Sequence, residues 1–359
     1  MLETRIEKLG SKIAEEKLDA VLIFSDSNRF YLSGFHGSNG LLYINADYAM
    51  LFTDFRYTEQ AKTQAPDYEV IQAGKDGLFI SCIETLEGKL GKKLGFEKAH
   101  ATLAQYEKMK DAFNGKAELV PVEQMVEKLR LVKSPGEIEL IKKAQDISEK
   151  AFNEWLGKLK PEMTEAEAAL ELEIGMRRFG SGPVAFDIIV GAGPNAALPH
   201  HTPDDTPLGK GRTIVVDFGA TYGWYNSDTT RTIFIGSAPD GMRDIYEIVL
   251  EAQLAALGAL GKGKSGIEID AAARDHINDS GHAEHFGHGL GHGIGIDVHE
   301  GPVLSPKSED ILEPFNVFSV EPGIYIPGVG GVRIEDLCWL KAEGGYENLT
   351  GLPKDLIIL

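Results

Sequence analysis

Long hydrophobic runs are absent from this chain, and cysteine is rare. No apolar run approaches the roughly 20 residues that are needed to cross a bilayer. The first residues, MLETRIEKLGSKIAEEK, are charged and amphipathic and lack the apolar stretch of a signal peptide. The two cysteines, Cys82 and Cys338, form no CxxC pair, so neither a thiolate zinc site nor a disulfide framework is indicated. We therefore expect a cytoplasmic protein that does not bind membranes.

Positive charge is also scarce. The chain has 36 Lys and Arg against 55 Asp and Glu, and its formal net charge is −19 at pH 7. Binding to nucleic acid needs clustered Lys and Arg, so this balance argues against nucleic acid as a partner. Much of the acidity falls on expected helix faces such as EKLGSKIAEEK, where it is ordinary solubilising charge.

The first third of the chain alternates between helical and strand patterns. Helices are expected near 2–17, 56–65 and 102–113, and strands near 19–24, 40–46, 49–54, 68–74 and 117–122. This alternation predicts a small α/β domain. A long helix then begins at KSPGEIELI, where Ser134, Pro135 and Glu137 take the N-cap, first-turn and third positions of a capping box. We place the boundary near 122–133 and assign residues 1–124 and 125–359 to two domains.

The second domain is expected to be α+β. A second capping box, Thr164 to Glu167, opens a helix that should stop at Gly180, and further helices are expected near 239–261 and 267–279. Two segments share a design: RTIVVDFGATYGWYNSDTTRTIFIG and NVFSVEPGIYIPGVGGVRIEDLCWLK. Each reads as two strands around a glycine-containing turn.

Acidic residues occur inside the apolar strands of both hairpins. Asp217 and Asp228 are eleven positions apart, and Glu321 and Glu335 are fourteen apart, so each pair suits the two arms of one hairpin. A buried carboxylate is costly unless it is paired or bound to a metal. Four mutually close carboxylates repel, so their convergence requires cations or retained protons. Two divalent metals satisfy this requirement best, and carboxylates with one imidazole suit Mn²⁺, Co²⁺ or Fe²⁺ better than a structural zinc.

The imidazole should come from a histidine cluster. Six of the ten histidines lie between residues 276 and 299, most densely in HFGHGLGHGIGIDVHEGP. His288 and His292 have the spacing of a helical zinc pair, but the glycines between them oppose a helix and no glutamate follows His288. A dinucleotide fingerprint fails as well, because His292 stands where its third glycine would be. A loop or strand is therefore expected here.

Taken together, the motifs DFGATYGWYNSDTTRT, GHGLGHGIGIDVHEGP, SVEPGIYI and GGVRIEDL resemble those of the pita-bread metallopeptidases, in the branch of prolidase and aminopeptidase P. The segments YLSGFHGSNG and LFTDFRYTEQA resemble the creatinase-type N-terminal domain, so the resemblance covers essentially the whole chain. It implies an α/β N-terminal domain, a pita-bread catalytic domain, two divalent metal ions with Mn or Co favoured, and a homodimer.

The resemblance also assigns roles to residues. It implies that Asp217 binds one metal, that Asp228 and Glu335 bridge both, and that His292 and Glu321 bind the other. Glu321 would also carry the proton to the leaving nitrogen when the bond before proline is cleaved. Further catalytic and substrate-binding positions are His200, His299, His288, Arg333, Tyr325 and Phe186, with Thr230 in support. The other histidines of these segments, His201, His276, His282 and His285, are expected to be structural.

Several functions remain open at this stage. A methionine aminopeptidase would normally lack the N-terminal domain, and a creatinase-like amidinohydrolase would not need the full set of metal ligands. An inactive binding protein on this scaffold should have lost ligands, and all five are present. Between a dipeptidase acting on Xaa-Pro and an aminopeptidase P acting on longer peptides, the short Glu321 to Glu335 spacing and the modest length favour the dipeptidase.

Overall fold

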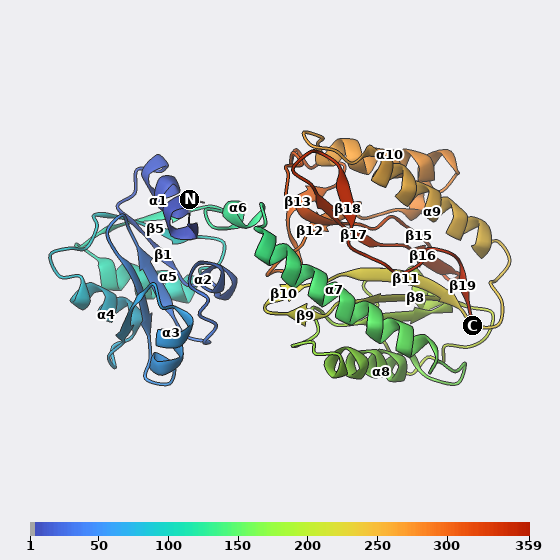
Figure 1. Ribbon diagram of the computed structural model, residues 1–359, viewed down its shortest axis with the longest axis horizontal. Coiled ribbons are helices and arrows are strands. Elements are labelled where there is room, and N and C mark those ends of the chain that lie inside the picture. The colour runs from blue at the N-terminus through green and yellow to red at the C-terminus, as the bar shows by residue number, and fades with distance from the viewer. Residues whose placement is uncertain (1–3) are drawn as a thin grey trace. The chain divides into compact units, whose positions relative to one another are not determined.

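The computed structural model describes residues 4–359 and divides the chain into two compact units (Figure 1). The first unit extends to Arg130 and the second runs from Leu131 to Leu359. This division lies inside the 122–133 region where the sequence places the boundary, and six residues beyond the expected end of the first domain at 124.

The first unit is built on a six-stranded mixed sheet with the strand order β4-β3-β2-β1-β5-β6. Strands β1, β5 and β6 run parallel, and β2 runs antiparallel to both of its neighbours. The strands are β1 (Ala20–Ile23), β2 (Leu41–Ile44), β3 (Ala49–Thr53), β4 (Glu69–Gln72), β5 (Lys93–Glu97) and β6 (Glu118–Val122). The helices are α1 (Arg5–Glu15), α2 (Asp26–Ser33), α3 (Thr58–Gln64), α4 (Leu78–Thr85), α5 (Leu103–Phe113) and α6 (Glu127–Arg130). The expected α/β domain is confirmed.

Two helices with the expected capping boxes open the second unit. In α7 (Pro135–Leu156) the Ser134 side chain accepts from the backbone of Glu137, and in α8 (Glu165–Arg178) Thr164 does the same for Glu167. Each box satisfies backbone N–H groups that the first turn of a helix leaves unpaired. Helix α8 ends at Arg178, and Gly180 follows with a φ of 101°, a conformation that glycine adopts without strain.

Strands in the second unit form a four-stranded sheet (β19-β11-β8-β7), a five-stranded sheet (β13-β12-β14-β17-β18) and the pairs β9–β10 and β15–β16. They are β7 (Ile189–Ala192), β8 (Thr213–Phe218), β9 (Thr221–Tyr222), β10 (Tyr225–Asn226), β11 (Thr229–Phe234), β12 (Gly291–Gly293), β13 (Glu300–Leu304), β14 (Val317–Val320), β15 (Gly323–Ile326), β16 (Gly330–Arg333), β17 (Asp336–Leu340), β18 (Tyr346–Asn348) and β19 (Ile357–Ile358).

Helix pairs cover the strands from two sides (Figure 1). Helices α7 and α8 pack on β7, β8 and β11 around Phe152 and Phe218, which stack with ring centroids 5.1 Å apart. Helices α9 (Met242–Ala259) and α10 (Gly266–Asp279) pack on the second group of strands around Phe318. The two hairpins predicted from the sequence lie between these helix pairs, where their side chains are shielded from water.

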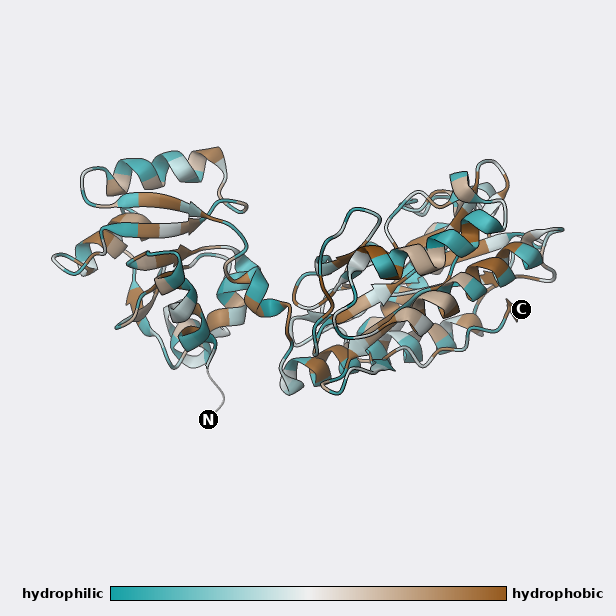
Figure 2. Ribbon diagram, turned by 90° about the horizontal axis from the view of Figure 1, so that it is seen from above, coloured by the Kyte–Doolittle hydropathy of each residue, from teal (hydrophilic) through white to brown (hydrophobic). Residues whose placement is uncertain are grey.

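Hydropathy follows this layering. In Figure 2 the strands are largely hydrophobic, whereas the helices carry hydrophobic and hydrophilic residues on different faces. Within residues 4–359, no helix is both long and apolar enough to span a membrane.

Candidate metal centre

The first hairpin places two aspartates on one face. Asp217 lies on β8 directly opposite Thr230 of β11, and Asp228 comes immediately before β11. Because side chains two positions apart on a strand share a face, Asp228 lies diagonally across from Asp217 on that face. Asp217 and Asp228 are thus diagonal neighbours and do not pair directly.

The second hairpin brings two glutamates face to face. Val320 pairs with Asp336 in one sheet and Gly323 pairs with Arg333 in the next, so the register between the two pairs sets Glu321 opposite Glu335. The two hairpins are also joined, because the Glu335 N–H donates to the Thr230 carbonyl oxygen at 3.1 Å. Four carboxylates therefore meet where the hairpins cross.

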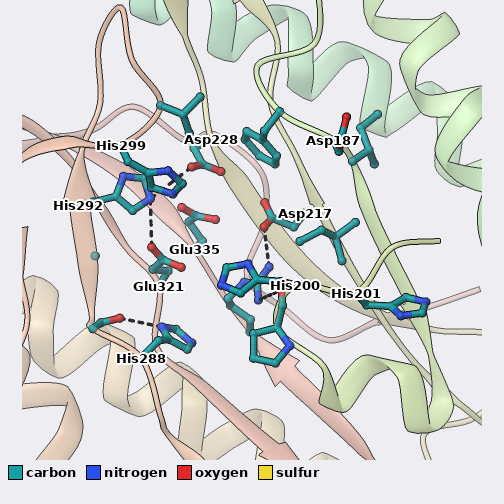
Figure 3. A pocket seen from close by; sticks show the side chains of 18 of the residues that line it. Asp187, His200, His201, Asp217, Asp228, His288, His292, His299, Glu321 and Glu335 are labelled. Atoms are coloured by element: carbon teal, nitrogen blue, oxygen red, sulfur yellow. Dashed lines mark hydrogen bonds and ion pairs between the residues drawn. The ribbon is translucent and has the colours of Figure 1, made fainter. Parts of the chain in front are cut away.

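His292 supplies the imidazole from β12. Its Nδ1–H donates to the Gly293 carbonyl oxygen at 3.0 Å, which leaves the lone pair on Nε2. Nε2 lies 3.6 Å from Asp228 Oδ2 and 3.3 Å from Glu321 Oε1. Figure 3 shows the side chains of Asp217, Asp228, Glu321, Glu335 and His292 directed toward a common space.

The donor atoms fit divalent cations. Among the residues that the structure describes, Asp217 Oδ1, Asp228 Oδ1 and Glu335 Oε1 are buried and have no hydrogen-bond partner. Asp228, His292 and Glu335 each offer a ligand atom within 4.8 Å of the others. Buried, unpartnered carboxylate oxygens are costly, and metal coordination removes that cost.

The same crowding changes the protonation of the carboxylates. Burial, together with the negative charges of Glu335, Asp217 and Glu321, raises the pKa of Asp228 well above its usual range. Burial also raises the pKa of Glu335, with Glu321 and Asp217 adding to the effect. For Glu321, burial raises the pKa to about 7, although Arg333 opposes the shift. Without a cation, this group of acids retains protons near neutral pH.

Arg333 and Thr230 orient the ligand carboxylates. Arg333 Nη2 donates to Asp217 Oδ2 at 2.6 Å, and its Nε donates to Thr230 Oγ1 at 2.9 Å. The Thr230 hydroxyl in turn donates to Glu335 Oε2 at 2.9 Å. Ser319 supports Glu321 in the same way, at 3.1 Å from Oε1. Asp217, Glu321 and Glu335 therefore each have one oxygen held by a protein donor.

His288, Tyr325 and Arg333 form a chain of hydrogen bonds. His288 Nδ1–H donates to the Gly289 carbonyl oxygen at 2.7 Å, so Nε2 accepts from the Tyr325 hydroxyl at 2.8 Å. The same hydroxyl accepts from Arg333 Nη1 at 3.0 Å. Burial, and then the Arg333 charge, lower the pKa of His288 to about 4, so this imidazole is neutral at pH 7.

A cavity of about 550 Å³ contains all five metal-binding candidates. Its walls also include Phe186, His200, His288, His299 and Arg333. The His299 ring packs edge to face on His292 with centroids 4.3 Å apart. Two sequence-predicted residues, Tyr325 and the supporting Thr230, are not part of the cavity wall. Tyr325 reaches the site through His288 and Arg333.

His201 points away from the carboxylates (Figure 3). Its Nε2 lies 2.6 Å from Oε2 of Glu165, a fully buried residue at the start of α8. Glu165 also accepts from the backbone N–H groups of Ala192 at 2.7 Å and Asp204 at 3.2 Å. One carboxylate thus ties together both ends of the loop that carries His200.

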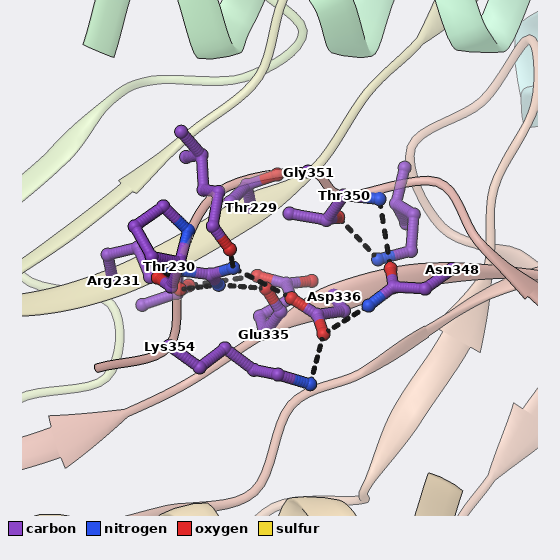
Figure 4. Close-up of polar contacts among 12 residues, drawn as sticks. Thr229, Thr230, Arg231, Glu335, Asp336, Asn348, Thr350, Gly351 and Lys354 are labelled. Atoms are coloured by element: carbon purple, nitrogen blue, oxygen red, sulfur yellow. Dashed lines mark hydrogen bonds and ion pairs between the residues drawn. The ribbon is translucent and has the colours of Figure 1, made fainter. Parts of the chain in front are cut away.

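A buried ion pair beneath Glu335 was missed from the sequence. Arg231 and Asp336 are fully buried and 2.8 Å apart, and Arg231 Nη1 donates to the Glu335 carbonyl oxygen (Figure 4). Asn348 and Lys354 donate to the second Asp336 oxygen. The sequence did contain a signal for this pair, because Arg231 and Asp336 are charged residues inside the apolar strands β11 and β17. The same kind of signal identified the four candidate carboxylate ligands.

Comparisons with known proteins agree with this geometry. The family model described as "Metallopeptidase family M24" matches residues 139–342, and the one described as "Creatinase/Prolidase N-terminal domain" matches residues 5–132. The chain belongs to metallopeptidase family M24. The resemblance, the expectation of a metallopeptidase, and the combination of an α/β domain with a pita-bread domain are therefore confirmed.

Relatives of the M24 chain include both types of proline-specific enzyme. The chain is 36% identical over 357 residues to the Xaa-Pro dipeptidase of Pyrococcus furiosus, and this alignment covers 99% of this chain and 100% of that protein. It resembles the structure of Xaa-Pro dipeptidase from Bacillus anthracis with a TM-score of 0.95 and 42% identity, covering 99% of each chain. It resembles X-Pro aminopeptidase from Thermotoga maritima MSB8 with a TM-score of 0.90 and 40% identity, covering 96% of this chain and 98% of that one.

The raised acid pKa values predict a pH-dependent response to cations. Glu321 has a pKa of about 7 in the folded protein against an ordinary value of 4.5. The folded state then binds more protons than the unfolded state between these values, so the metal-free protein loses stability as pH rises through that window. A saturating divalent cation should therefore raise Tm more at pH 7.5 than at pH 5.5. Calorimetry of chelated and reloaded protein tests this, and an equal shift at both pH values would contradict it.

Proposed function

We propose that this M24 metallopeptidase is a Xaa-Pro dipeptidase that works with two divalent metal ions. The observation that carries the proposal is the convergence of four carboxylates and one imidazole from two hairpins and β12 in one cavity. The relatives named Xaa-Pro dipeptidase support the substrate class. Its homodimeric state and cytoplasmic location stay predictions.

The metal ligands would be those expected from the sequence. Asp217 would bind one ion, Asp228 and Glu335 both, and His292 and Glu321 the other. Four carboxylates with one imidazole favour Mn²⁺ or Co²⁺. Once bound, the ions supply an activated water molecule and polarise the peptide carbonyl. The tautomer of His292 supports this assignment, because its hydrogen bond to Gly293 directs the Nε2 lone pair at the carboxylates.

Protein groups would carry the remaining chemistry. Glu321, a carboxylate in the cavity wall 3.3 Å from His292 Nε2, would take up a proton and pass it to the leaving nitrogen. His299, adjacent to His292, would donate to the oxygen on which negative charge develops. His200 would contact the peptide. The chain from His288 through Tyr325 to Arg333 would position that arginine for the substrate, and Phe186 would line an apolar subsite.

Aminopeptidase P activity on longer peptides is the second candidate, and the X-Pro aminopeptidase from Thermotoga maritima at 40% identity favours keeping it. The expected result is hydrolysis of an Ala-Pro dipeptide at a higher kcat/KM than of an Ala-Pro-Ala tripeptide, measured with Mn²⁺ and with Co²⁺. A chelated sample serves as the control and should be inactive until metal is restored. Faster cleavage of the tripeptide would establish the aminopeptidase instead, and full activity after metal removal would refute a metal-dependent reaction.

A further inference from the structure

A second cavity of about 730 Å³ adjoins the metal centre. Val298 and His299 line both cavities. A second stretch of chain also runs from one cavity to the other, because Gly182, Pro183 and Ala185 line the second cavity and residues 186–189 line the first. A group bound at the metal centre can therefore extend into the second cavity along two shared walls.

The tip of the β9–β10 hairpin, Gly223 and Trp224, lines this second cavity. Tyr222 pairs with Tyr225, so the loop consists of Gly223 and Trp224 alone, with φ values of 56° and 72°. Positive φ at both positions defines a type I′ turn, whose second position favours glycine. A residue as bulky as tryptophan rarely adopts a positive φ, so the backbone of Trp224 is strained at this position. The Trp224 side chain lines the cavity and is 37% exposed.

The surrounding structure holds this strained turn in place. Asn226 Nδ2 donates to the Ile296 carbonyl oxygen at 2.8 Å, and the Asn226 N–H donates to Gly295 at 2.9 Å. On the other side, the Tyr225 hydroxyl donates to Glu137 of α7 at 2.8 Å. A strained backbone that neighbouring contacts fix on both sides is a mark of function, because a glycine would satisfy the turn with less strain.

We infer that Trp224 and this cavity form a specificity subsite for a large apolar or aromatic side chain on the residue before proline. The inference rests on the proposed function, since a Xaa-Pro dipeptide has one variable side chain. Trp224, Pro183, Ile296 and Val298 offer apolar surface to it. Among residues 4–359, Asp297 is the one carboxylate that lines this cavity and no Lys or Arg lines it, so the subsite disfavours acidic side chains.

The experiment measures kcat/KM of wild type, Trp224→Gly and Trp224→Phe on the dipeptides Ala-Pro and Phe-Pro. If the enzyme prefers longer peptides, Ala-Pro-Ala and Phe-Pro-Ala replace them. Trp224→Gly should lower the ratio of kcat/KM for the Phe substrate over the Ala substrate by about tenfold, mainly through KM, because one aromatic contact is lost. Trp224→Phe should retain most of the ratio. Trp224→Gly should also raise Tm, because glycine adopts this turn without strain.

The other outcomes separate the two proposals. An unchanged ratio in Trp224→Gly, in an active enzyme, overturns the subsite and leaves the proposed function intact. A shift in oligomeric state of Trp224→Gly by light scattering, with no change in the ratio, would make Trp224 an interface residue and also overturn the subsite. A wild type that is inert with Mn²⁺ and Co²⁺ on all four peptides overturns both.

Discussion

Glu321→Gln should lower kcat by about 10²–10⁴-fold, the typical contribution of a general acid or base. The amide keeps the shape of the side chain and one oxygen, but it can neither carry a proton nor contribute a negative charge. Glu321 is suited to proton transfer because its carboxylate lies in the cavity wall beside the other metal-binding candidates, 3.3 Å from His292 Nε2. Ser319 holds Oε1 at 3.1 Å, which fixes the carboxylate in the cavity.

Metal content must be measured with the rate, because Glu321 is also a proposed ligand. We expect the variant to keep part of its metal, and excess Mn²⁺ should not restore the rate. Glu309→Gln, which changes an exposed glutamate of the same unit, is the matched control and should behave as wild type. If Glu321→Gln kept more than about a tenth of the wild-type kcat, the proton carrier would have to be another group.

Much of the catalytic unit could be predicted from the sequence, because its signals are local. The capping boxes at Ser134 and Thr164 fix the starts of α7 and α8. Acids placed inside apolar strands identified Asp217, Asp228, Glu321 and Glu335, which the structure gathers in one cavity. Such residues stand out because a buried charge needs a partner wherever the chain places it.

Elements without a clear period were missed. Helix α4 is a short, mostly apolar segment, LFISCIET, and periodicity cannot separate such a run from a buried strand. Strand β5, KLGFE, carries Lys93 and Gly95, both of which weaken a strand pattern. Helix α2 is polar, and its buried Asn28 and Arg29 follow from tertiary contacts that the local sequence does not encode.

The hydrogen-bond partners in the site were equally out of reach. The resemblance placed His288 with the catalytic residues and Tyr325 with the substrate contacts, yet the structure joins both to Arg333 in one chain. The Glu165 contact to His201 spans 36 positions in the sequence. Pairings of this kind depend on how strands and helices pack, and a single sequence carries no direct signal for them.

Asp228→Ala should remove metal from both sites, whereas Asp217→Ala should retain up to one tightly bound ion per chain. Asp228 belongs to the tight group of candidate ligands, with an oxygen within 4.8 Å of the ligand atoms of His292 and Glu335. Asp217 is outside that group, and its Oδ2 accepts from Arg333 at 2.6 Å. A shared carboxylate offsets the repulsion between two cations, so its loss weakens both sites together, while the loss of a terminal ligand weakens one.

Elemental analysis after equilibrium dialysis against Mn²⁺ or Co²⁺ counts the ions, with circular dichroism to establish that each variant is folded. Asp187→Ala is the matched control, because Asp187 is an exposed aspartate in the wall of the same cavity and is not a proposed ligand. It should bind two ions. Hydrolysis should be lost in Asp228→Ala and nearly lost in Asp217→Ala, since neither variant holds both metal ions. Two ions per chain in both variants would mean that these aspartates are not ligands, and the two-metal centre would have to be abandoned.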